Sequence, residues 1–157
     1  MAKVSGNLKK ALAAGVIFFA TASIAHSSEP AETIHTRQQG LKDMGASLKL
    51  VRDQLRQPAP DMAAIKAAGE NIKKTADLMA NWFPKGSGTE SGIKTGAKPE
   101  IWSDADTFEK KRMDLVKAAD PFAELTAAGD KEAISAAVRP LSGTCKGCHE
   151  IFFNDER

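Results

Sequence analysis

The sequence predicts an all-α protein whose helices pack side by side. After the N-terminal stretch the chain is rich in Ala, Lys, Glu, Leu and Met, and it contains no Tyr, a composition that favours helices. Four segments repeat apolar residues at the spacing of amphipathic helices. Proline and glycine separate these segments, and we find no convincing strand pattern.

The first predicted helix spans about residues 30–57 and ends before Pro58-Ala59-Pro60, because proline cannot continue a helix. Two rows at seven-residue spacing form a seam typical of a bundle: Ile34, Leu41, Leu48 and Leu55, and Arg37, Met44 and Val51. Arg37 is the unusual member of this seam. Either its stem carries the charge out to water, or its guanidinium meets an anion inside the protein.

The second predicted helix spans about residues 61–81, with Asp61 as its N-cap. Its apolar rows are Ile65, Ile72 and Met79, and Met62, Gly69 and Ala76. The small residues of the second row leave room either for a flat cofactor or for close helix packing. A long connection rich in Gly, Pro and Ser follows at 81–100, and connections of this length are often functional.

The third predicted helix begins after Ser103 or Asp104 as N-cap and runs to residue 128, where Gly129 ends it. Phe108, Leu115 and Phe122 repeat at seven-residue spacing. Pro121 lies inside the pattern, so we expect a kink or break near residue 120.

The fourth predicted helix spans about residues 130–154, and Pro140 is expected to bend it. Its inward stripe consists of Ile134, Val138, Leu141, Cys145, Cys148 and Phe152.

The run Cys145-Lys146-Gly147-Cys148-His149 predicts covalent attachment of one haem c. Two thiols must reach the two vinyl groups of the porphyrin and form thioethers, and an imidazole must then bind the iron as proximal ligand. On a helix these positions are i, i+3 and i+4, which share one face. Because both cysteines continue the apolar stripe, the haem should lie against the inside of the bundle. Trp82 and Phe83, in the long connection, should pack against the bundle end or the haem edge.

Other interpretations of the two cysteines fit less well. A zinc site would need a second pair of ligands, and the chain offers only His26 and His35. A thioredoxin-type dithiol would need a βαβ context. A disulfide between Cys145 and Cys148 would strain a helix.

The N-terminus predicts export. Residues 1–25 resemble a signal peptide with Lys3, Lys9 and Lys10 before an apolar stretch and a cleavage site after Ala25. That stretch, residues 11–25, is shorter than the roughly 20 residues of a spanning helix.

Residues 26–157 then form one domain with 19 basic and 20 acidic side chains and a formal charge of −1. This charge indicates neither nucleic acid nor a membrane as partner. We expect a periplasmic protein with no membrane attachment after cleavage.

Four stretches of the chain resemble the cytochrome c′ / cytochrome c-556 family of class II c-type cytochromes. They are residues 36–45 around Arg37, the loop 83–88, residues 98–102, and the motif at 144–149 close to the C-terminus. The resemblance implies an antiparallel up-down-up-down four-helix bundle with covalently bound haem c. It also implies a homodimer through the first two helices.

The resemblance also assigns roles to single residues. Cys145 and Cys148 would carry the thioethers, and His149 would be the proximal ligand. Arg37 would lie near a haem propionate, and Leu41 would face the distal side of the iron. Family members often have a basic residue four positions after the proximal His, whereas this chain has Phe153.

Leu41 has no donor atom, so we expect a five-coordinate iron open to NO or CO in a protein that transfers electrons with small redox proteins. The alternative is a low-spin six-coordinate carrier of the c-556 type with Met44 as sixth ligand. His35 is a less favoured distal ligand, because it lies about 120° around the helix from Leu41. We find no nucleophile–base pair that would lie near the haem, so we do not expect an enzyme.

Overall fold

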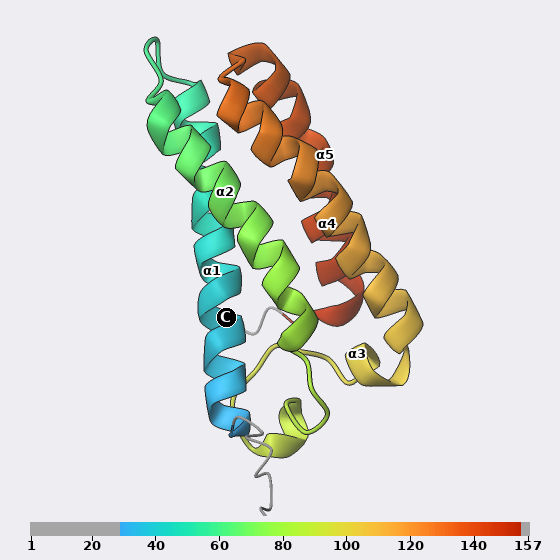
Figure 1. The fold of residues 1–157 in the computed structure, drawn as a ribbon. Helices are drawn as coiled ribbons and strands as arrows, with labels where there is room; N and C mark the ends of the chain where they lie inside the picture. The colour runs from blue at the N-terminus through green and yellow to red at the C-terminus, as the bar shows by residue number, and fades with distance from the viewer. Residues whose placement is uncertain (1–28, 155–157) are drawn as a thin grey trace, which may run out of the picture.

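The computed structural model describes residues 29–154, and it is all-α, as predicted (Figure 1). Four long helices are joined by short helical pieces: α1 Pro30–Leu55, α2 Met62–Leu78, η1 Met79–Asn81, η2 Thr89–Ser91, α3 Glu100–Ser103, α4 Ala105–Ala128 and α5 Lys131–Phe152. The signal-peptide prediction, residues 1–25, lies outside the described residues. Within residues 29–154, no helix is long and apolar enough to cross a membrane.

The long helices run up, down, up and down, with α1 packed on α2, α2 on α4 and α4 on α5. The start of α1 and the end of α5 therefore lie at the same end of the bundle. The long connection between α2 and α4, which includes α3, covers this end (Figure 1). The topology thus brings Arg37, near the start of α1, to the same end as the C-x-x-C-H motif.

Side-chain caps start three of the long helices near the predicted places. Asp61 Oδ1 accepts a hydrogen bond from the backbone N–H of Ala64 at 2.9 Å. Asp104 caps α4 and Asp130 caps α5 in the same manner, each satisfying N–H groups that have no partner within the helix. Gly129 ends α4 in the left-handed conformation, as predicted.

The structure differs from the sequence prediction in three local features. The short helix α3 precedes α4, and α1 and α5 end two residues earlier than expected. Pro121 lies within α4, which continues without a break. Its position on the exposed side explains this, since water can hydrogen-bond the carbonyl group that loses its N–H partner. Pro140, also exposed, lies within an equally continuous α5.

The main core runs along the bundle axis between the four long helices. Fully buried members from each helix include Val51, Ile65, Ile72, Phe122, Ile134 and Leu141. Gly69 on α2 allows α4 to approach closely, because a Cβ atom at this position would overlap Thr126. Of the two explanations for the small residues of α2, the structure therefore supports close helix packing at Gly69.

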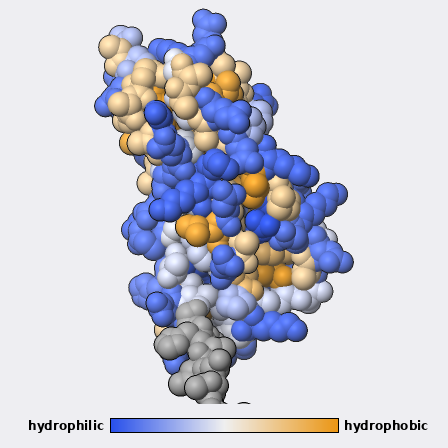
Figure 2. All heavy atoms as spheres, in the orientation of Figure 1, coloured by the Kyte–Doolittle hydropathy of each residue, from blue (hydrophilic) through white to orange (hydrophobic). Residues whose placement is uncertain are grey.

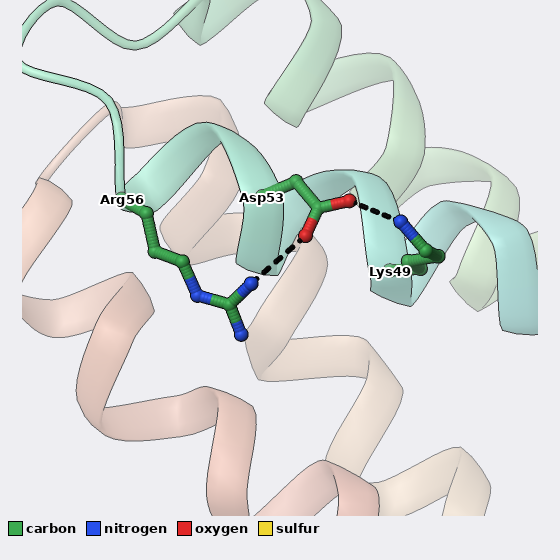
Figure 3. A network of polar contacts seen from close by, with 3 residues as sticks. All are labelled: Lys49, Asp53 and Arg56. Carbon is green, nitrogen blue, oxygen red and sulfur yellow. Dashed lines mark hydrogen bonds and ion pairs between the residues drawn. The ribbon is translucent and has the colours of Figure 1, made fainter.

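On the face that Figure 2 shows, hydrophilic side chains cover much of the surface, with smaller apolar patches between them. On the last turns of α1, Asp53 accepts hydrogen bonds from Lys49 and Arg56 (Figure 3). The bond from Lys49 lowers the pKa of Asp53. This network lies at the opposite end of α1 from Arg37, so it has no part in the site described below.

Candidate haem-binding site

A cavity of about 560 Å³ opens at the end of the bundle where α1, α5 and the long connection meet. The α1–α2 side contributes Arg37, Leu41 and Met79, and the α4–α5 side contributes Phe108, Cys148 and His149. The connection adds Phe83, residues 94–97 and Ile101. The lining is largely apolar with a few polar groups, as is usual for a cofactor site.

The C-x-x-C-H motif occupies the last turns of α5. Cys148 and His149 line the cavity, whereas Cys145 is half-buried and packs against the main core. Both thiols are free. Burial raises the pKa of Cys145 and raises that of Cys148 to about 11, so both are neutral at pH 7. Two free thiols and an imidazole on one helical face fit the attachment and ligation that haem c requires.

Arg37 is 2% exposed and projects from α1 into the connection. Its Nη1 donates to Trp82 O and to Ser87 Oγ, both at 3.1 Å. Its Nη2 donates to Ser87 O and to Thr95 Oγ1, both at 2.9 Å. Of the two possibilities left open by the sequence, the structure excludes the solvent-exposed one.

The charge of Arg37 is compensated only weakly by protein groups. Within residues 29–154 Arg37 forms no ion pair, although its Cζ lies 4.8 Å from the centroid of the Phe83 ring. Burial lowers its pKa, and the charge of Glu90 opposes that effect. A buried cation held only by neutral hydrogen-bond acceptors attracts an anionic ligand, so Arg37 fits an anionic edge of the cofactor.

Aromatic rings form the floor of the cavity. Phe83 and Phe108 lie 4.8 Å apart between ring centroids, and Phe108 and Phe152 lie 5.3 Å apart, both edge to face. Trp102 fixes the connection by donating from Nε1 to Phe83 O at 3.1 Å. These contacts hold Phe83 in the cavity wall, where an apolar macrocycle can pack against it.

Three residues weighed from the sequence lie elsewhere. Met44 is 6% exposed in the main core and does not line the cavity. Trp82 packs into the core, over Gly40, where a Cβ atom would overlap its ring. His35 is exposed and lines a separate groove between α1 and α2. The structure thus brings Arg37, Leu41, Phe83, Cys148 and His149 together in one cavity, without these three.

Met79 and Phe153 line the cavity and were not predicted to do so. Met79 was placed in an apolar row of the second helix, but a helical pattern cannot tell which end of a row faces a cavity. Phe153 was noted only as a departure from the family pattern. Its place in the lining depends on the path of the chain after α5.

Comparison with known proteins agrees with this geometry. The model of the cytochrome c′ family matches residues 32–152. The cytochrome c′ of Pararhodospirillum photometricum is 33% identical over 126 residues, which are 80% of this chain and 98% of that protein.

Two solved structures show the same fold. A cytochrome c′ with an unusual ligand-controlled dimer dissociation superposes with a TM-score of 0.77 at 29% identity, covering 82% of this chain and 99% of that one. A nitric oxide complex of a mutant cytochrome c prime from Alcaligenes xylosoxidans gives a TM-score of 0.72 at 27% identity, covering 82% and 98%. This chain therefore belongs to the cytochrome c′ family, whose proteins carry one covalently attached haem c.

Proposed function

We propose that this protein is a periplasmic electron-transfer protein with haem c. Its iron is five-coordinate and open to NO or CO. The observation that carries this proposal is the composition of the cavity wall. Leu41 lines the cavity that contains His149, and Met44 does not. A leucine side chain offers no donor atom to iron, so α1 presents an apolar surface at this position and supplies no ligand from it.

Five residues of the cavity wall, together with Cys145 in the preceding turn of α5, have a part in this proposal. Cys145 and Cys148 would hold the haem by thioethers, and His149 would bind the iron. The haem supplies the one-electron chemistry. Arg37 would face a propionate with its positive charge, which has no ion-pair partner within residues 29–154. Leu41 would keep the distal side apolar, and Phe83 would pack against the ring.

A related protein supports the gas-binding part of this function. A cytochrome c prime from Alcaligenes xylosoxidans forms a nitric oxide complex, so we propose a diatomic gas as ligand of this protein as well. In this proposal the protein exchanges electrons with small redox proteins or binds a diatomic gas, and it is not an enzyme. We also propose a homodimer through α1 and α2, since a related cytochrome c′ shows a ligand-controlled dimer dissociation.

Absorption spectra of the oxidised and reduced protein, with a CO titration, test the coordination. We expect a high-spin spectrum and stoichiometric CO binding by the reduced protein. A sharp, split low-spin band without CO binding would contradict the open site. In that case, a Met44→Leu variant with a high-spin spectrum would establish the six-coordinate carrier instead.

The covalent link and the export have their own tests. Haem should stay with the denatured wild type and be lost when both Cys145 and Cys148 are changed to Ala; extraction of haem from the wild type by acid–acetone would disprove attachment.

We propose that residues 1–25 are cleaved on export. N-terminal sequencing of the protein from a periplasmic extract should begin at His26, and recovery of the full-length chain from the cytoplasm would contradict export.

A further inference from the structure

Residues 152–154, which follow the haem motif, lie against the long connection at the cavity. After α5 ends at Phe152, the backbone at Phe153 becomes extended and forms an isolated antiparallel bridge with Ala97. Lys98 N donates to Phe152 O at 3.0 Å, and Asn154 N donates to Gly96 O at 2.8 Å. These two hydrogen bonds attach the C-terminal end of α5 to residues 96–98 of the connection.

The Phe153 ring lies against the side chain of His149. The two ring centroids are 5.1 Å apart with an angle of 41° between the planes, and both residues line the cavity. Gly96 makes this position possible, because a Cβ atom there would overlap the Phe153 ring and approach Asn154 O. The ring is thus held between the imidazole and the backbone of the connection, although Phe153 remains 42% exposed.

We propose that Phe153 is a positioning residue for His149. Its ring limits rotation of the imidazole and screens one side of it from water, while the bridge to residues 96–98 keeps the ring in place. This role rests on the proposed function, because it has a consequence only when His149 binds iron. Groups around a metal-bound histidine fix its orientation and tune the metal.

The chemistry of phenylalanine determines how Phe153 is expected to change the reduction potential of the iron. The ring carries no charge and no hydrogen-bond donor for the imidazole, so it acts by packing and by lowering the local polarity. An apolar surrounding disfavours the more highly charged ferric state and raises the reduction potential. Loss of the ring admits water and should lower the potential.

The test uses the holoprotein and four variants. Phe153→Leu removes the ring but stays apolar, and Phe153→Tyr keeps the ring. Gly96→Ala leaves residue 153 intact but displaces its ring and the neighbouring backbone at Asn154. Ile151→Val is the matched control, since Ile151 is 40% exposed at the same end of α5 and does not line the cavity. The readouts are the reduction potential and the iron–imidazole stretching band of the ferrous protein in resonance Raman spectra.

We expect Phe153→Leu and Gly96→Ala to lower the potential and to shift or broaden the iron–imidazole band, because the imidazole gains rotational freedom. Phe153→Tyr and Ile151→Val should match the wild type. If Phe153→Leu does not fold, Gly96→Ala decides the question.

Two results would overturn the proposal: a Phe153→Leu variant with wild-type potential and band, or an equal change in Ile151→Val. A wild-type protein with a low-spin spectrum and no such band would refute the five-coordinate iron instead. The potentials of the same variants would then still decide the role of Phe153.

Discussion

At the scale of single residues, two buried methionines differ in whether they line the cavity. Leu41 contributes to its wall from α1 and Met79 from η1, directly after α2, on the side that also carries Arg37. Met79 and Met44 have the same chemistry and nearly the same burial, 5% and 6% exposed. Only Met79 of the two lines the cavity, so this pair separates an effect on ligand access from an effect on stability.

We predict that Met79→Ala speeds CO association with the reduced protein, because it removes part of the cavity wall. Met44→Ala should leave the CO association rate unchanged. Both variants should lose about 2–5 kcal/mol of unfolding free energy, as buried large-to-small substitutions do. Flash photolysis and urea unfolding measure the two quantities. Equal CO rates in the two variants would exclude a role for Met79 in ligand access.

Arg37 is predicted to raise the reduction potential, because its positive charge favours the ferrous state over the ferric one. Arg37→Leu should therefore lower the potential, and Arg37→Lys, which keeps the charge, should lower it less. Arg37→Leu should also lose at least about 1.5–3 kcal/mol of stability, the usual contribution of one hydrogen bond to a charged group. A potentiometric titration that gives the wild-type value for Arg37→Leu would remove Arg37 from the haem site.

At the scale of the helices, close packing of α2 on α4 depends on one glycine. Gly69 lies opposite Thr126, which is itself buried and donates to Ala123 O at 2.8 Å. Gly45 offers a control on α1, since it is exposed and a Cβ atom there would meet nothing within 4 Å. The two positions share the helical preference for Ala over Gly but differ in the space available.

Gly45→Ala should therefore stabilise the protein by about 0.5–1 kcal/mol through helix propensity. Gly69→Ala should destabilise it, because overpacking typically costs about 1–3 kcal/mol and exceeds that gain. Urea unfolding followed by circular dichroism measures both. Stabilisation by Gly69→Ala would show that α4 can move away from α2 at no cost.

At the scale of the whole molecule, the bundle separates two faces of α1. One face carries Arg37 and Leu41 in the cavity, and the other, with α2, forms an open groove lined by His35, Leu78 and Trp82. Leu78 is 42% exposed, which suits a residue that a second copy of the chain would cover in the proposed dimer.

Leu78→Glu should convert that dimer to a monomer, because a buried carboxylate without a partner is costly. Ile151→Glu changes an equally exposed apolar residue on α5 and should leave the dimer intact. Sedimentation velocity of the holoprotein measures both states. A wild type that sediments as a monomer would refute the dimer, and dissociation by both variants would place the interface elsewhere.

The sequence alone predicted the four long helices, since apolar periodicity and the aspartate caps are local properties. It also predicted the C-x-x-C-H motif on one helical face, because i, i+3 and i+4 positions coincide on any helix. The short helix α3 and the unbroken course of α4 through Pro121 were not predicted. They depend on solvent exposure and on contacts with the rest of the bundle, which no local pattern contains.

The tertiary structure decided which of the predicted residues share the cavity. A seven-residue repeat places Leu41, Met44 and Leu48 on one seam, but only the crossing of helices determines where that seam opens into a cavity. Arg37 was recognised as unusual from its seam position, whereas its four hydrogen bonds depend on the path of the connection. Phe153 meets Gly96 across 57 residues of chain, and such a contact exists only after the bundle has brought the two segments together.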